Sequence, residues 1–203
     1  MTKLEYDADS IFDLEVGNSV RLGDVSYKIK KFSRGGMGFI IYLCQSNSRP
    51  SEKFSIHGQR VVIKAALGDD SGNIQNLFLR ELTIWAGFRN RNIINLNEII
   101  QIDNVYAAAM NWCHGSLREY ISNNEKLAPE ISFYVIDSII SALSYACRNH
   151  SVFHLDLKPE NVLYDKRYEP YGLFMVSDWG ISSIRGELAK HANLSNRRRI
   201  FFR

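Results

Sequence analysis

Apolar residues in the first half of the chain follow patterns that are typical of β-strands. Short runs either alternate between apolar and polar residues or are continuously apolar and β-branched, and polar residues separate them. We predict strands over residues 25–32, 39–44, 59–67, 96–102 and 105–110. A polar loop, residues 45–58, is expected between the second and third of these strands.

Two stretches carry apolar residues at the spacing of an amphipathic helix. In residues 73–88 the apolar positions are Ile74, Leu77, Phe78, Leu82 and Trp85. Residues 129–150 form a longer pattern that opens on Pro129, which suits a first helical turn. The apolar positions of this second stretch include Ile131, Val135, Ile139, Leu143 and Ala146. A strand-rich first half therefore precedes a helical second half, which predicts an α+β fold.

The composition indicates a globular chain. Its 203 residues are 45% hydrophobic, enough to bury a substantial core. There is no run of about 18 apolar residues and no signal-peptide pattern at the N-terminus, so we expect a cytoplasmic protein without a membrane span. Cys44, Cys113 and Cys147 are widely spaced among apolar neighbours. This spacing predicts buried, reduced thiols rather than disulfides or metal ligands.

The net charge of +3 is unevenly distributed along the chain. From Ile181 onward six Lys or Arg residues oppose one acid, Glu187, which gives this end +5 and leaves −2 for the rest. The cations do not alternate with aromatic residues, which occur here only as Phe201 and Phe202. We therefore expect a solvated or partner-facing end, and no nucleic acid as a ligand.

A glycine cluster, Gly35, Gly36 and Gly38, joins the first two predicted strands. Glycines let the backbone approach a ligand and aim its N–H groups at phosphate oxygens, although the same cluster also suits an ordinary hairpin turn. Lys64 ends an apolar run, where an unpaired ammonium is costly to bury. It would need an anion such as Glu81 on the following helix, or it would reach water at the strand end.

The stretch from His150 to Asp165 gathers Asp156, Lys158 and Asn161 in a loop that an apolar strand follows. A carboxylate can orient a hydroxyl, a cation can offset charge on a moving phosphoryl group, and an amide oxygen can hold magnesium. A second metal-binding carboxylate is then expected, and Asp178 comes directly after another apolar strand. Asp-x-Gly turns also occur by chance, but this order of residues indicates phosphoryl transfer.

These motifs resemble those of the protein kinase family, in the family's order from about Val25 to Gly180. The matching pieces are the glycine-rich loop, "VVIK", a glutamate on the next helix, "HLDLKPEN" and "DWG". The resemblance implies a two-lobed kinase-like fold with MgATP between the lobes, and transfer of the γ-phosphoryl group of ATP to Ser or Thr hydroxyls of proteins. "DLKPEN" is similar to serine/threonine kinases, and "GGMG" to bacterial kinases of eukaryotic type.

The resemblance also implies a role for each motif residue. Asp156 would orient the substrate hydroxyl and accept its proton, and Lys158 would offset γ-phosphate charge. Asn161 and Asp178 would hold magnesium. Lys64, paired with Glu81, would contact the ATP phosphates above which Gly35, Gly36 and Gly38 lie. The adenine site would consist of Met110 as gatekeeper, Asn111 to Cys113 as hinge, and apolar walls from Ile40, Val62 and Leu163.

Three positions depart from the family's usual motifs. Ser33 stands where the first loop glycine is usual, Leu155 replaces the arginine before the catalytic aspartate, and Trp179 replaces the phenylalanine of Asp-Phe-Gly. The missing arginine would pair with a phosphorylated activation loop, so we do not expect switching by that route. The larger Trp179 ring should still pack as the phenylalanine does.

The chain after Gly180 is short: 23 residues follow it, without an Ala-Pro-Glu motif. We expect an N-terminal extension (1–24), a small lobe (25–110) and a reduced C-terminal lobe (111–203), with a short hinge at Trp112 to Ser116. Such a chain would be a fragment of a longer kinase, or would resemble the minimal kinases that some bacterial pathogens deliver into host cells. The alternative function is a nucleotide-binding scaffold with little or no transfer, and either function implies a protein substrate or regulatory partner.

Overall fold

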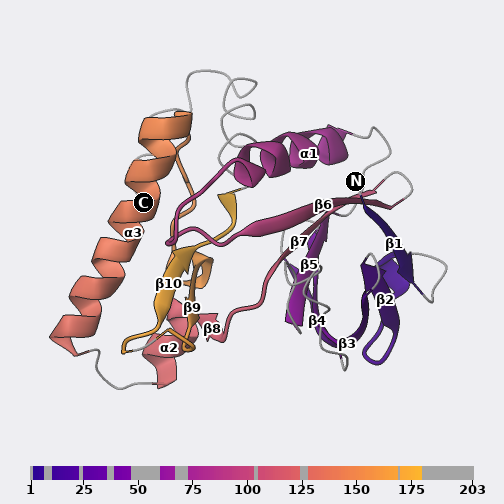
Figure 1. Cartoon of the computed structure of the whole chain (residues 1–203), viewed down its shortest axis with the longest axis horizontal. Coiled ribbons are helices and arrows are strands. Elements are labelled where there is room, and N and C mark those ends of the chain that lie inside the picture. The colour runs from indigo at the N-terminus through magenta and orange to yellow at the C-terminus, as the bar shows by residue number, and fades with distance from the viewer. Residues whose placement is uncertain are drawn as a thin grey trace, which may run out of the picture. The chain divides into compact units, whose positions relative to one another are not determined.

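The structure is a computed structural model that describes residues 2–6, 11–22, 25–35, 39–46, 60–66, 73–102, 105–123, 128–168 and 170–179. Its internal contacts divide the chain into two compact units, which Figure 1 shows with their elements labelled. The first unit comprises Met1–Arg89 and Ile94–His114, and the second comprises Asn90–Ile93 and Gly115–Arg203. One boundary between the units lies after His114, and the hinge expected at residues 112–116 stays a prediction.

The first unit is a seven-stranded closed barrel with one long helix. The strands are β1 (Thr2–Tyr6), β2 (Ser19–Leu22), β3 (Val25–Gly35), β4 (Phe39–Gln45), β5 (Arg60–Ala66), β6 (Leu96–Ile102) and β7 (Val105–Asn111). They follow one another around the barrel in the order β1-β2-β3-β4-β5-β7-β6, and β1 closes it by pairing parallel to β6. A short 3-10 helix, η1 (Ile11–Asp13), connects β1 to β2.

Alternation along the strands fills the barrel interior with apolar side chains. In β3, Tyr27 and Ile29 are buried, whereas Lys28 and Lys30, which alternate with them, are exposed. The interior cluster also includes Ile40, Tyr42, Cys44, Val61, Ile63, Ala107 and Ala109. The buried Tyr42 hydroxyl donates a 2.6 Å hydrogen bond to the carbonyl of Ile11 in η1. This bond satisfies the one polar atom that the Tyr42 ring carries into the core.

Strands β1 and β2 take part in the barrel, where the sequence predicted only an N-terminal extension before the sheet. Leu4 of β1 pairs with Leu22 of β2, and Val20 of β2 pairs with Tyr27 of β3. Thr2 pairs with Ile100, far along the sequence. Both strands are short, and the pairing that defines them is distant, so local patterns could not indicate them.

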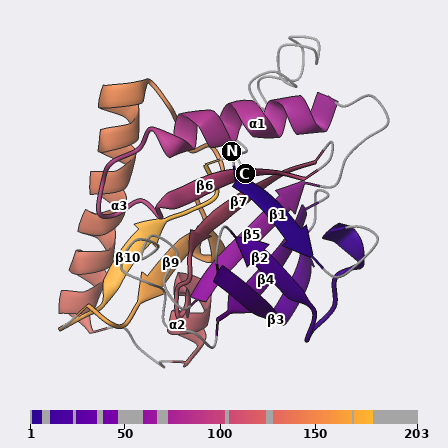
Figure 2. The ribbon, with the colours of Figure 1, turned by 45° about the vertical axis from the view of Figure 1, so that its right-hand side comes forward.

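Helix α1 (Asn73–Ala86) lies along β6 and β7, as Figure 2 shows. Its inner face buries Phe78, Leu82 and Trp85, at the spacing that the sequence predicted. Gln75 fixes the start of the helix, because its amide donates to the carbonyl of Ala66 (2.7 Å) and accepts from the backbone of Tyr106 (2.7 Å). At the other end, the Trp85 indole donates to the carbonyl of Ile94 (2.8 Å).

The second unit packs helices against a small sheet. Strands β8 (Gly115–Ser116), β9 (Val162–Asp165) and β10 (Leu173–Val176) form the antiparallel order β10-β9-β8. The helices are α2 (Leu117–Asn123), α3 (Pro129–His150) and the 3-10 turn η3 (Pro159–Asn161). One face of the sheet carries Val162, Tyr164 and Phe174 into a core with Leu117, Tyr120, Tyr134 and Val135 from the helices.

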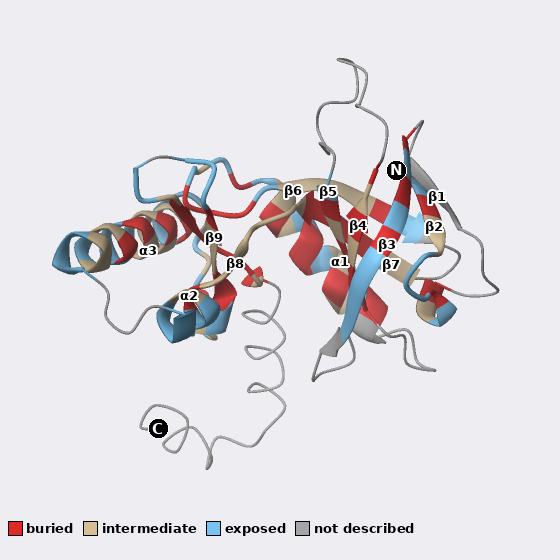
Figure 3. Ribbon diagram, turned by 90° about the horizontal axis from the view of Figure 1, so that it is seen from below, coloured by how far each residue is buried: buried red, intermediate tan, exposed pale blue. Residues whose placement is uncertain are grey.

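Helix α3 begins at Pro129 and ends at His150, as predicted, with Ser151 in the left-handed region (φ 54°) closing it. Figure 3 shows buried residues along only one side of this helix, and these are Val135, Ser138, Ala142 and Ala146. By length and composition α3 could cross a membrane, but the core helix of a soluble domain passes the same test. Here the buried side of α3 packs on the core beside β10.

The cysteines are free, but their burial differs from our prediction. Cys44 lies in the barrel core, where burial raises the pKa of its thiol to about 12. Cys113 is only half-buried, and Cys147 is exposed. Cys147 is on the outer side of α3. Its apolar sequence neighbours did not indicate this, because that helix has apolar residues on several faces.

Gly172 is expected to be sensitive to replacement by alanine. It has φ +82°, and an added Cβ would lie 3.2 Å from the carbonyl oxygen of Asp165, in the strand that pairs with β10. Gly17 has a similar φ of +99° but open space around it. We expect Gly17→Ala to cost about 1 kcal/mol from backbone strain and Gly172→Ala about 2 kcal/mol or more. Denaturant melts of the two variants measure both costs, and equal losses would contradict the close contact.

Candidate active site

The loop after α3 brings together the three polar residues that the sequence singled out. The Lys158 ammonium is 2.8 Å from Oδ2 of Asp156, and the Asn161 amide donates to the Asp156 carbonyl (2.8 Å) and to Oδ2 (3.3 Å). The Asp156 side chain is 13% exposed and that of Lys158 is 46% exposed. The hydrogen bond from Lys158 to Asp156 raises the pKa of the lysine, so the ammonium stays charged at neutral pH. The carboxylate is thereby fixed in place, with its cation at the surface.

His154 holds this loop in place through both nitrogens of its imidazole ring. Its Nε2 donates to the carbonyl of Ser177 (2.8 Å), since a carbonyl can only accept, and its Nδ1 accepts from the backbone N–H of Asp156 (3.4 Å). Its ring centroid lies 4.8 Å from that of Trp179, in an edge-to-face contact. Both ring nitrogens therefore act in their neutral-imidazole roles. These contacts indicate a structural role for His154.

Stability should depend on the charge state of His154. Burial lowers its pKa from the ordinary value of 6.5, although the Ser177 hydrogen bond partly offsets that effect. Below pH 6.5 the unfolded chain therefore binds more protons than the folded one, and the free energy of unfolding falls as pH decreases toward the lowered pKa. His154→Gln, which does not titrate, should flatten this pH dependence by up to about 1.4 kcal/mol per pH unit. Denaturant melts from pH 7.5 to 5.5 test this, with His150→Gln as control; an unchanged slope would contradict it.

Asp178 follows β10 in a strained backbone conformation. Its φ is 63°, in the left-handed region that aspartate tolerates better than most residues. Directly before it, Ser177 donates from its backbone N–H (2.8 Å) and from its hydroxyl (3.0 Å) to the carbonyl of Asn161. These two bonds hold the segment with Asp178 against the turn with Asn161. The Asp178 carboxylate is close enough to act electrostatically on both His154 and Lys158.

The side-chain oxygens of Asn161 and Asp178 fit a magnesium ion that also binds ligands from outside the chain. The Asn161 side-chain nitrogen is committed to Asp156, so its amide presents the oxygen as the possible ligand. Asp178 adds a carboxylate, and both are hard oxygen donors of the kind Mg²⁺ prefers. Within the described ranges, no group of three or more His, Cys, Asp or Glu side chains could hold a metal by itself. An ion here would therefore complete its coordination with further ligands such as water or phosphate oxygens.

In the first unit, strand register places three of the predicted residues on one face. Val62 pairs with Met110, and Lys64 pairs with Ala108 and Ile41, so their side chains share the outer face of β4, β5 and β7. Met110 and Lys64 are 6% and 8% exposed. Glu81, on the inner side of α1, is 4% exposed. Lys64 thus does not reach water at a strand end, and both charged residues are buried in the same unit.

Ile40 lies elsewhere than the predicted adenine wall requires. It pairs with Ala65 and belongs to the barrel interior, 1% exposed, on the face opposite to Val62 and Lys64. The uninterrupted apolar run of β4 gives no indication of which residues face inward, so the sequence could not separate Ile40 from its neighbours. The face with Val62 carries Ile41 and Leu43 instead, and no feature of the sequence marked these two residues as adenine contacts.

The remaining predicted residues are placed as follows. The Asn111 side chain accepts a 2.7 Å hydrogen bond from Asn97, and Cys113 is half-buried. Between them, the Trp112 ring lies 4.5 Å from the Arg60 guanidinium carbon and 4.6 Å from the His114 ring. In the second unit Leu163 pairs with Met175, on the sheet face opposite to the helices. Gly35 ends β3, whereas Gly36 and Gly38 lie outside the described residues.

A comparison with known protein families shows which family this chain belongs to. Residues 52–196, more than half of the chain, match the family described as "Protein kinase domain". The chain belongs to the protein kinase family. Its α+β fold is a kinase fold, and kinases in general use ATP and Mg²⁺.

Several curated kinases are similar to this kinase domain. CBL-interacting protein kinase 14 of Oryza sativa subsp. japonica is 28% identical over 152 residues, which cover 74% of this chain and 32% of that protein. Serine/threonine-protein kinase PrkC of Bacillus subtilis (strain 168) is 32% identical over 107 residues, covering 52% of this chain and 16% of PrkC. Carbon catabolite-derepressing protein kinase of Saccharomyces cerevisiae is 26% identical over 156 residues, which cover 77% of this chain and 23% of that protein. The chain thus spans a third or less of the length of these relatives.

Proposed function

We propose that this kinase domain transfers the γ-phosphoryl group of ATP to Ser or Thr hydroxyls of proteins. The observation that carries the proposal is the Asp156 carboxylate, which Lys158 and Asn161 hold in one orientation at the surface of the second unit. A carboxylate so placed can accept a hydrogen bond from an incoming hydroxyl and take its proton.

Lys158 and the two magnesium ligands complete the phosphate end of the proposed site. The Lys158 ammonium stays charged and is directed at the catalytic carboxylate, from where it can offset charge on the transferring phosphoryl group. Asn161 and Asp178 would hold Mg²⁺ through their oxygens, which supplies positive charge beside the phosphates. The two Ser177 bonds to the Asn161 carbonyl support this role, because they hold together the segments that carry the two ligands.

In the first unit, Lys64 would contact the α- and β-phosphates and Glu81 would orient it. Both side chains are buried, and a buried ammonium is stabilised by a nearby carboxylate and by bound phosphate. We further propose adenine contacts from Val62, Met110, Leu163 and the backbone of Asn111 to Cys113. Ile41 or Leu43 replaces Ile40 in this set, because they share the face with Val62. The backbone at Gly35, Gly36 and Gly38 would cover the phosphates.

The test is phosphoryl transfer from labelled ATP by the full chain, measured as autophosphorylation and with a generic Ser/Thr protein substrate. Incorporation into Ser or Thr, identified by mass spectrometry, is the expected result. A thermal-shift titration with MgATP runs beside it. A melting shift without any incorporation would overturn the proposal in favour of a nucleotide-binding scaffold. The absence of both a melting shift and incorporation would show that the chain does not use the nucleotide at all.

A further inference from the structure

The second unit carries an apolar groove that the proposed chemistry does not use. The groove encloses about 580 Å3 between the C-terminal half of α3 and the loop after it. Its apolar lining comes from Leu143, Cys147, Val152, Phe153, Leu155 and Leu157. Phe153, Leu155 and Leu157 are 62%, 56% and 44% exposed. Three large apolar side chains gathered at one exposed site indicate a surface that another element covers.

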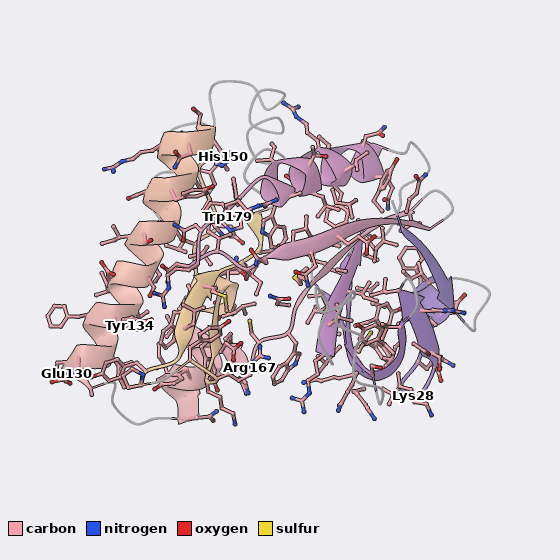
Figure 4. All side chains as sticks on the ribbon, in the orientation of Figure 1. Lys28, Glu130, Tyr134, His150, Arg167 and Trp179 are labelled. Atoms are coloured by element: carbon pink, nitrogen blue, oxygen red, sulfur yellow. The ribbon has the colours of Figure 1, made fainter. Side chains whose placement is uncertain are left out.

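The exposed apolar surface continues from the groove along the outer side of α3. Phe133, Ile136 and Ile140 are 73%, 53% and 57% exposed, and Leu143 and Cys147 follow them into the groove. These five positions are separated alternately by three and four residues, which places them in one stripe along the helix. Such a stripe is suited to packing against a second helix. Figure 4 labels Glu130 and His150, between which the stripe runs.

The described part of the chain ends directly beside this groove. Trp179 is 3% exposed, and its indole donates to the carbonyl of Val176 (3.1 Å). Its ring centroid is 4.8 Å from that of His154, and His154 lines the groove. The chain therefore leaves its described part beside a residue that lines the groove, and consecutive Cα atoms along it are about 3.8 Å apart. A segment tethered at this point meets the groove at a high effective concentration.

The sequence after Trp179 has an apolar pattern that matches the stripe. Ile181, Ile184 and Leu188 are separated by three and four residues, with Ser182, Ser183 and Arg185 between them. As a helix, residues 181–188 would be about 10 Å long from first to last Cα, which equals the rise of α3 from Ile140 to Cys147. Gly186 weakens this helix by about 1 kcal/mol relative to alanine, so the turn depends on docking for its stability.

We propose that residues 181–188 of the same chain occupy this groove. Ile181, Ile184 and Leu188 would pack on Leu143, Cys147 and the exposed loop side chains. Each Å2 of apolar surface that this contact removes from water contributes roughly 25 cal/mol. The occupant is the chain's own segment rather than a second copy, because the tether at Trp179 favours the intramolecular contact at any concentration below the effective one.

Cysteine crosslinking tests the contact in the full chain. Cys147 lines the groove and is exposed, whereas Cys44 is buried with its pKa raised to about 12. In a Cys113→Ser background, Ile184→Cys should crosslink to Cys147 with a short bismaleimide, and peptide mapping should identify the pair. The matched variant Ser183→Cys, on the opposite side of the segment, should crosslink at least about tenfold less. Equal yields from positions 183 and 184 would overturn the proposal.

Dilution and a charge substitution separate the other possible occupants. An intramolecular crosslink keeps its yield on dilution, whereas a yield that falls with dilution and gives covalent dimers would show a second copy in the groove and overturn the proposal. Ile184→Asp with Leu188→Asp should increase apolar-dye binding and lower the melting temperature, and Ser182→Asp should change neither. None of these readouts uses nucleotide or transfer, so they stand apart from the proposed function. Unchanged dye binding in the double variant would also overturn the inference.

Discussion

Asp156→Asn is expected to lower phosphoryl transfer by about 10²–10⁴-fold, the range that general acid–base catalysis contributes. The asparagine oxygen can still accept from Lys158 and Asn161, so the loop should keep its conformation. What is lost is the negative charge and the ability to take a proton from the substrate hydroxyl. MgATP binding should remain within about twofold of wild type, because the proposed phosphate and metal contacts come from other residues.

The measurement pairs initial rates of transfer with a MgATP thermal-shift titration on the same preparations. Asp137→Asn is a suitable control, because Asp137 is an exposed aspartate on α3 and the change removes the same charge from the same unit. It should leave both readouts unchanged. Full transfer activity in Asp156→Asn would mean that another group orients the hydroxyl, and the role proposed for Asp156 would fail.

The elements that the sequence predicted are those whose periodicity is long and local. Strands β3 and β5 and helices α1 and α3 lie within a few residues of their predicted bounds. Alternation marks most of β3, a largely apolar, β-branched run marks β5, and repeats of apolar residues mark the two helices. Strands β1 and β8 are short and are defined by pairing with distant partners, such as Thr2 with Ile100 and Gly115 with Tyr164. No local pattern carries that information.

The same distinction applies to the site. Asp156, Lys158 and Asn161 are close in sequence, so a loop brings them together almost regardless of the fold, and the structure shows the bonds that result. The contribution of Ser177 was not predicted, because its two bonds to Asn161 join residues 16 positions apart. Its signal in the sequence is weak: a small polar residue between an apolar strand and an aspartate.

In continuously apolar elements, the sequence does not indicate which residues point into the core. In β4 the run from Phe39 to Leu43 has no polar residue to mark the outer side, and only the pairing of Ile40 with Ala65 reveals that Ile40 points into the barrel. In α3, apolar residues on several sides concealed the exposure of Cys147. A one-residue change of register or a 100° rotation exchanges inside for outside in such elements, and tertiary packing decides between them.

Lys64→Met is expected to abolish most of the stabilisation by MgATP and to reduce transfer by at least about 10²-fold, as removal of one preorganised charge contact to a reacting group does. Methionine fills a similar volume and tolerates the apolar surroundings of a residue that is 8% exposed. The fold of the first unit should therefore persist, and the substitution removes chiefly the ammonium that would meet the phosphates.

A thermal-shift titration with MgATP measures the expected loss of stabilisation. At a MgATP concentration of 100 times the wild-type Kd, binding should stabilise the wild-type chain by about 2.7 kcal/mol. A 100-fold weaker variant would gain only about 0.4 kcal/mol at the same concentration. Lys28→Met is the matched control, since Lys28 is an exposed lysine of β3 in the same unit, and it should retain the full wild-type shift. If Lys64→Met kept that shift as well, the buried ammonium would serve the fold through Glu81 alone, and the phosphate contact proposed for it would be wrong.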